Sequence, residues 1–224
     1  MSEPLVVAMT GASGAIYAVR LLDVLINAGQ DVHLTISPSG AVVLQQELGK
    51  VVDLDSFDLK QLLDGSADQN APPGGNCDSH DHTTQPGTVT YFHYRDFMAP
   101  AASGSAKSLG MVVCPCSGGT LSSIAHAASG NLIHRAADVH LKEHRKLILV
   151  PRETPLSSLQ LENMLRVSQA GAVVLPAMPG WYHGVTQLND LVDFVVARIL
   201  DQLGIAHNLM RRWGDAESQP GNRQ

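Results

Sequence analysis

The sequence has 224 residues, 44% of them hydrophobic, and a formal net charge of −6 at pH 7. We expect one domain over residues 1–224, with no basic surface for a nucleic-acid backbone and no run of the ~18 apolar residues that a membrane-spanning helix needs. Three cysteines make no disulfide framework and the first residues lack the pattern of a signal peptide, so a cytoplasmic protein is expected.

Short apolar runs alternate with longer segments of helical periodicity along most of the chain. Strands are expected at 5–9, 32–37, 111–114, 147–150 and 172–175, and helices at 15–28, 41–48, 121–128, 156–169 and 188–203. Repeated strand-helix units of this kind predict a mainly parallel sheet with helices on both faces. The expected fold is therefore a three-layer α/β/α domain of the Rossmann-like (flavodoxin-like) class.

The segment 65–87 interrupts this alternation. It is rich in proline, glycine and polar residues, so a flexible surface insertion is expected there. Its Cys77, His80 and His82 are residue types that bind metals, but the spacing C-x2-H-x-H matches no structural zinc pattern, and no metal site is expected. Residues 207–224 are expected to form a C-terminal tail.

The stretch MTGASGAIYAVRLL follows the first predicted strand and predicts a tight turn that opens a helix. Backbone N–H groups at such a turn favour an anion, so a phosphate is plausible there. A dinucleotide-binding turn needs a third glycine where this chain has Tyr17, and an acidic residue where the second strand ends in Ser37. A mononucleotide therefore fits better. Ser13 has two open interpretations, a hydroxyl that contacts a bound heterocycle and a plain helix N-cap.

A second turn of small residues follows the strand at 111–114. The sequence CPCSGGTLSSIA places two hydroxyls and two glycines at a helix start, namely Ser117, Gly118, Gly119 and Thr120. This composition suits a phosphate or a ribityl-type chain. Cys114 and Cys116 are expected to pack as small buried residues, because the sequence implies no base beside them. The stretch MAPAASGSA at 98–106 is either a ligand loop or a connecting turn.

Several charged or phenolic side chains are candidates for an anion site. Arg135 and Lys142 are seven residues apart and therefore share one face of a helix. Charges on helix faces are usually only solvated, whereas Glu153 follows a predicted central strand, at the sheet edge where ligands of open α/β sheets bind. Tyr182 and Arg198 add a phenol and a guanidinium. Together with the glycine turns, these residues indicate a site for more than one phosphate.

Five motifs occur in order along the chain: GASGAIYAVRLL, PAASGS, CPCSGGTLSSIA, LIHRAADVHLKEHRKLILVPRETPLSSLQLENML and GAVVLPAMPGWYH. With them the chain resembles the flavin prenyltransferase family of the UbiX/Pad1 type, over nearly everything outside 65–87. The resemblance implies that a dimethylallyl group passes from dimethylallyl phosphate to N5 and C6 of reduced FMN. It also implies that the product, prenylated FMN, serves a UbiD-type decarboxylase, and that the chain forms a homo-oligomer, in this family a dodecamer.

The resemblance further implies roles for individual residues. FMN would be held by Gly11, Ala12, Ser13, Ser37, Ser117, Gly118, Gly119, Thr120 and Arg135. The prenyl phosphate would be held by Lys142, Tyr182 and Arg198, and Trp213 would cover the prenyl chain. Ser13 would lie beside flavin N5, and Glu153 would carry a proton near the leaving phosphate. Lysine and arginine can stabilise a monophosphate leaving group by themselves, so no metal is expected.

Two other functions are weighed against this one. An FMN-dependent cysteine decarboxylase has a similar fold, but those enzymes carry P-x-M-N-x-x-M-W where this chain has PAASGSAK. A non-catalytic FMN-binding subunit of a decarboxylase needs the flavin turns but neither Glu153 nor Lys142. The prenyltransferase is therefore the favoured function.

Overall fold

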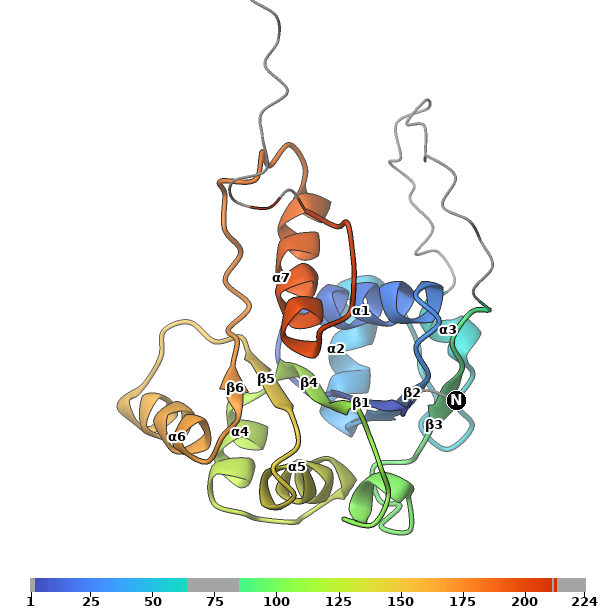
Figure 1. Ribbon diagram of the computed structural model, residues 1–224, viewed down its shortest axis with the longest axis vertical. Coiled ribbons are helices and arrows are strands. Elements are labelled where there is room, and N and C mark those ends of the chain that lie inside the picture. The colour runs from blue at the N-terminus through green and yellow to red at the C-terminus, as the bar shows by residue number, and fades with distance from the viewer. Residues whose placement is uncertain (1–2, 64–84, 211, 213–224) are drawn as a thin grey trace, which may run out of the picture.

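The computed structural model describes residues 3–63, 85–210 and 212, and Figure 1 shows a sheet between two layers of helices. The strands, in chain order, are β1 (Leu5–Met9), β2 (Val32–Ile36), β3 (Val89–Tyr91), β4 (Gly110–Cys116), β5 (Leu147–Pro151) and β6 (Val173–Val174). The helices are α1 (Ala15–Asn27), α2 (Pro38–Leu48), α3 (Leu59–Leu63), α4 (Gly118–Ala125), α5 (Leu132–Lys142), α6 (Ser158–Gln169) and α7 (Leu188–Leu203), with a 3-10 turn η1 (Pro100–Ala102).

The sheet has the strand order β3-β2-β1-β4-β5-β6, and every neighbouring pair is parallel. The chain starts in the middle, builds outward to β3, and then returns past β1 to build outward to β6. The helices that follow the neighbours β1 and β4 lie on opposite faces of the sheet (Figure 1). We call the place between β1 and β4, where the order of the strands reverses, the switch point. Ligands of open α/β sheets bind at the carboxyl ends of the strands at such a point.

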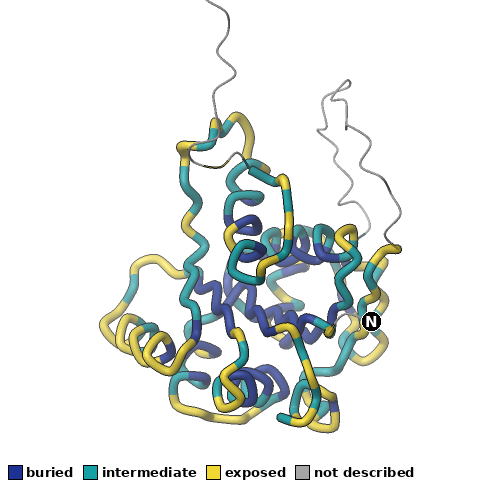
Figure 2. Tube along the Cα trace, in the orientation of Figure 1, coloured by how far each residue is buried: buried dark blue, intermediate teal, exposed yellow. Residues whose placement is uncertain are grey.

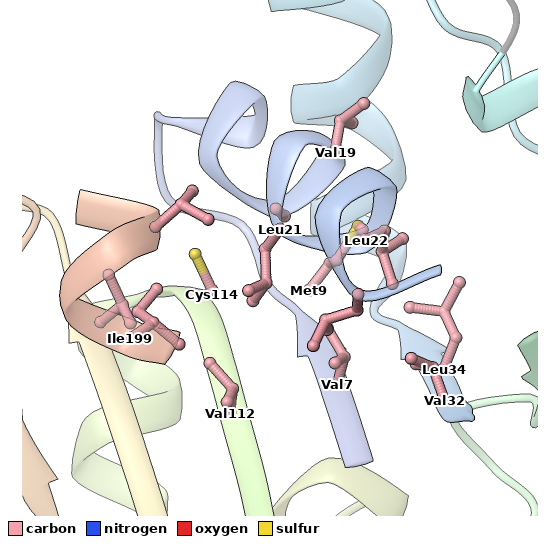
Figure 3. Close-up of a cluster of buried hydrophobic side chains, with 14 of the residues drawn as sticks. Val7, Met9, Val19, Leu21, Leu22, Val32, Leu34, Val112, Cys114 and Ile199 are labelled. Carbon is pink, nitrogen blue, oxygen red and sulfur yellow. The ribbon is translucent and has the colours of Figure 1, made fainter. Parts of the chain in front are cut away.

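Side chains of the central strands alternate between two cores. Val7 and Met9 of β1 face the layer of α1, α2, α3 and α7, whereas Val6 and Ala8 face the layer of α4, α5 and α6. Figure 3 shows the first core, where α1 and Ile199 of α7 pack on β1 and β4. All residues of β1, β4 and β5 are buried, as the dark central trace of Figure 2 shows. The expected three-layer, parallel fold is confirmed.

Side-chain caps fix where several helices begin. Ser37, Ser117, Asn131 and Ser157 each accept a hydrogen bond from a backbone N–H in the first turn of α2, α4, α5 and α6. Because of the first two caps, α2 and α4 begin three residues before the predicted 41 and 121, and because of the last, α6 begins two residues after 156. The sequence does not predict β3, α3 or η1, which have three to five residues each.

Gly87, the last residue of the predicted insertion 65–87, lies among the described residues and packs against the end of α1. The Gly87 N–H donates to the Ile26 carbonyl at 2.8 Å, and a Cβ on Gly87 would collide with the backbone of Gln30. The predictions that fall outside the described residues concern most of 65–87, Cys77, His80, His82, Trp213 and most of 207–224. Among the described residues, every helix is too short or too polar to span a lipid bilayer.

Candidate active site

Two of the predicted ligand turns lie side by side at the switch point. Thr10, directly after β1, donates from Oγ1 to the Pro115 carbonyl at 2.8 Å, and the same oxygen accepts from the Ser117 N–H at 2.8 Å. Thr10 is 1% exposed, so these two bonds form in a dry setting where an unmade bond is costly. One buried hydroxyl therefore holds the turn after β1 against the turn after β4.

The turn after β2 joins the same group. The Ser37 N–H donates to the Met9 carbonyl at 2.9 Å, and the Ser37 and Ser39 hydroxyls are 3.2 Å apart. A Cβ on Gly11 would collide with the side chain of Ser39, so only glycine allows the two turns to approach this closely. The predicted FMN residues Gly11 and Ser37 are thus brought together, with Ala12 in the same turn.

The N-terminus of α1, where a phosphate was plausible, is occupied by a carboxylate of this chain. The N–H groups of Gly14 and Ala15 both donate to Glu47 Oε2 at 2.9 Å. Burial raises the pKa of Glu47, but hydrogen bonds from the Ser13 side chain and the two amides, with the charge of Arg152, outweigh it and hold this pKa below its ordinary value. In this structure the amides at the start of α1 therefore bind a carboxylate of the same chain.

Ser13 is not the N-cap of α1. Gly14 has that position, with φ of 109° and no side-chain cap, so the plain N-cap interpretation of Ser13 is wrong. The Ser13 side chain hydrogen-bonds Glu47, and its carbonyl accepts from Arg152 Nε at 3.2 Å. The side chain and the carbonyl of Ser13 are therefore both bound by charged side chains, which fixes Ser13 at the edge of the sheet.

Sequence reasoning did not single out Glu47 or Arg152. Arg152 follows β5 directly and precedes Glu153, so the rule that ligands meet strand ends could have found it. Glu47 lies at the far end of α2, more than 30 residues from the amides that it binds. No local pattern marks such a residue.

Glu153 lies beside the turn at the start of α4. Gln160 Nε2 is 3.4 Å from Glu153 Oε2, and a Cβ on Gly118 would be 3.1 Å from the same nitrogen. Ser117 Oγ donates to Thr120 Oγ1 at 3.0 Å while it caps α4. A Cβ on Gly119 would meet nothing within 4 Å, so this turn opens outward.

Arg135 and Lys142 form a second group, on α5. Both lie against η1 and the loop that follows it, as expected for one helix face. Arg135 Nε donates to the Ala102 carbonyl, at the end of η1, at 3.1 Å, and Lys142 Nζ lies 2.8 Å from where a Cβ on Gly104 would be. Arg135 pairs with Asp138, and Lys142 pairs with its neighbour Glu143. Lys142 ends α5 shortly before β5 begins, hence toward the amino end of the sheet.

Tyr182 and Arg198 form a third group, beside the edge strand β6. The Tyr182 ring meets the Phe194 ring edge-on, with centroids 5.8 Å apart. Phe194 and Arg198, both on α7, line a hollow of about 260 Å³ together with β6. Arg198 Nη1 donates to Asp201 Oδ2 at 2.8 Å. One protomer thus places Ser13, Ser37, Ser117 and Glu153 at the switch point, and the predicted phosphate ligands at two other places.

The cysteines of β4 are buried. Burial raises the pKa of Cys114 and of Cys116, the latter to about 12, so both remain thiols at neutral pH. The interpretation of these residues as packing residues is confirmed by their positions. Within the described residues, no group of three or more His, Cys, Asp or Glu side chains is arranged to hold a metal ion.

Comparisons with known proteins agree with this geometry. Residues 1–200 match the family model "Flavoprotein". The chain is 46% identical to the flavin prenyltransferase UbiX of Pseudomonas aeruginosa, over 95% of each chain. Among solved structures it is similar to AnUbiX (PadA1) in complex with FMN and dimethylallyl pyrophosphate, with 34% identity, a TM-score of 0.78 and coverage of 97% of this chain and 100% of that one.

A second solved structure is similar to the same extent. It is a dodecameric FMN-dependent UbiX-like decarboxylase of Escherichia coli O157:H7, with 36% identity and a TM-score of 0.75, and the match covers 95% of this chain and all of that one. The fold, the order of the motifs and the sequence identity over nearly the whole chain therefore all indicate the same family. The chain belongs to the Flavoprotein family and, within it, to the UbiX flavin prenyltransferases.

Proposed function

We propose that this protein transfers a dimethylallyl group from dimethylallyl phosphate to N5 and C6 of reduced FMN and so makes prenylated FMN. The observation that carries the proposal is the switch point, where Ser13 is fixed between Glu47 and Arg152 and lies in one group with Glu153. A UbiD-type decarboxylase is the proposed recipient of the product. The chain is acidic and its three cysteines form no disulfide framework, which favours a location in the cytoplasm.

The turns at the switch point fit a flavin mononucleotide. Because Glu47 takes the amides at α1, we assign the phosphate of FMN to the start of α4. The backbone N–H groups of Gly118 and Gly119 would donate to it, and the Ser117 and Thr120 hydroxyls, which bond to each other in this structure, would turn toward it. The proposed FMN residues comprise Gly11, Ala12, Ser13, Ser37, Ser117, Gly118, Gly119, Thr120 and Arg135. When bound, reduced FMN supplies the nucleophilic N5 and C6 atoms.

The side chains of this protein then stabilise charge and move a proton. As the allylic C–O bond breaks, its electron pair stays with the phosphate, and the positive charges of Lys142 and Arg198 stabilise that anion together with the phenol of Tyr182. Glu153 would carry a proton, released from reduced FMN as the new bond forms, to the departing phosphate. The Ser13 hydroxyl is hydrogen-bonded to Glu47 and would be the group that orients flavin N5. Trp213, which lies outside the described residues, is the proposed cover of the prenyl chain.

The separation of the three groups favours a site completed by neighbouring subunits. Arg135 contacts η1, Lys142 contacts the loop after η1, and Arg198 contacts Asp201, rather than the switch-point residues. A homo-oligomer, as in the dodecameric relative, brings the phosphate ligands of one protomer to the flavin turns of another. Helix α6 follows Glu153 in the sequence, and its exposed leucines Leu159, Leu161 and Leu165 supply apolar contact area for such an assembly.

A direct assay tests the proposal. The protein is incubated without oxygen or added metal with reduced FMN and dimethylallyl phosphate, and the flavin is analysed by mass spectrometry. A flavin heavier by one C5H8 unit is expected. Glu153→Gln and Lys142→Ala should retain FMN but yield little adduct. Bound FMN with no adduct in the wild-type protein would instead favour a non-catalytic flavin-binding subunit.

A further inference from the structure

The carboxylate of Asp201, near the end of α7, accepts hydrogen bonds from three side chains, one on α7 and two beyond its end. Asp201 Oδ2 accepts from Arg198 Nη1 at 2.8 Å, three residues back on the same helix. Asp201 Oδ1 accepts from His207 Nε2 at 3.1 Å and from Arg212 Nη2 at 2.8 Å, both beyond the end of the helix. We call these four residues the Asp201 cluster.

The position of Asp201 requires an explanation. A negative charge in the last turn of a helix opposes the helix dipole and is unfavourable by itself. Burial also disfavours the charged carboxylate, yet the hydrogen bonds from Arg212 and His207 outweigh burial and lower the pKa of Asp201. The side chain of His207 is only 2% exposed. The cluster is thus an ordered feature that holds the segment after α7 against the helix.

Arg198 is the member of this cluster that faces a cavity. It lines the hollow between α7 and β6, and its side chain is half exposed. An arginine on a surface helix samples many rotamers, and a carboxylate that binds one Nη atom restricts them while the other N–H groups remain for a ligand. Within the described residues, Asp201 is the one carboxylate bound to Arg198.

We propose that Asp201 is a positioning residue for the prenyl donor, which fixes the guanidinium of Arg198 at the hollow and ties it to the segment that carries Arg212. The inference rests on the proposed function, in that Arg198 binds the donor phosphate. Asp201 itself carries a negative charge and does not touch the phosphate. It acts by presenting one arginine in the binding rotamer and by binding His207 and Arg212 beside it.

The test measures KM for dimethylallyl phosphate, kcat and the Kd for FMN in full-length variants. Asp201→Ala should raise KM about tenfold, the effect of one hydrogen bond between charged groups, with the Kd for FMN unchanged. Asp201→Glu should recover part of the loss. In an Arg198→Ala background, Asp201→Ala should raise KM no further, because its effect passes through Arg198. Asp23→Ala is the matched control, since Asp23 also pairs with an arginine three residues away, on α1, and should leave KM unchanged.

The outcomes separate this inference from the proposed function. If Arg198→Ala raises KM and Asp201→Ala does not, or if the two effects multiply, the positioning role is overturned. If Arg198→Ala itself leaves KM unchanged, the assignment of Arg198 to the donor phosphate fails and the role of Asp201 fails with it. FMN binding and the mass of the assembly, measured on each variant, identify a loss of folding, and Asp201→Glu then decides the question.

Discussion

Replacement of Glu47 by glutamine tests whether a carboxylate stabilises the start of α1. The variant keeps one oxygen as an acceptor for the Gly14 and Ala15 amides but loses the charge. A hydrogen bond to a charged group contributes about 1.5–3 kcal/mol and an acid at a helix N-terminus about 0.3–1 kcal/mol. Because Glu47 is exposed, solvent screening reduces the expected loss to about 1 kcal/mol. For a chain of this length, that lowers Tm by about 2–4 °C.

The pH dependence of this difference has a definite sign. Because the pKa of Glu47 is below its ordinary value of 4.5 in the folded protein, its contribution is present above that value and is lost as the pH falls through the folded pKa. Thermal denaturation of wild type and Glu47→Gln should therefore differ at pH 7, and the two Tm values should converge as the pH falls below 4.5. Glu162→Gln, at an exposed position of α6, is the control and should match wild type. Equal Tm values at pH 7, or a gap that persists in acid, would refute the role of Glu47.

The remaining predictions concern a buried link, a buried imidazole and an apolar surface. Thr10→Val leaves two polar groups without their partner and should lower the free energy of unfolding by about 1–3 kcal/mol; an unchanged denaturation midpoint would contradict the link between the turns. Burial lowers the pKa of His140, so the protein should lose stability as the pH falls below about 6.5, and His140→Gln should flatten this loss in a Tm series from pH 7 to 5. Leu161→Glu with Leu165→Glu should lower the mass of the assembly by light scattering, whereas Val42→Glu, equally exposed, should not; an intact assembly would exclude α6 as a contact surface.

Local chemistry explains which parts of the fold can be predicted from the sequence. The central strands are buried on both faces and therefore appear as continuous apolar runs. Ser37 and Ser117 follow such runs, and their place at the sheet edge is a consequence of strand order. The short elements β3 and α3 lack these signals. Of the three residues of β3, two are half-buried and one is exposed, so periodicity does not distinguish this strand from a loop.

The site shows the limits of the same reasoning. The turn after β1 indicates an anion, but Glu47 satisfies those amides from another helix, a contact that only the fold creates. Arg135 and Lys142 are placed correctly on one helix face, yet sequence alone does not reveal that this face contacts η1 and the loop after it instead of the switch point. Residues that act together through an assembly cannot be grouped from one chain.

A crystal structure of the protein with FMN and dimethylallyl phosphate tests the central claim most directly. We expect the isoalloxazine ring beside Ser13 at the switch point, with the donor phosphate between Lys142 and Arg198 contributed by neighbouring protomers. A flavin bound away from Ser13, or a donor phosphate that contacts neither cation, would contradict it.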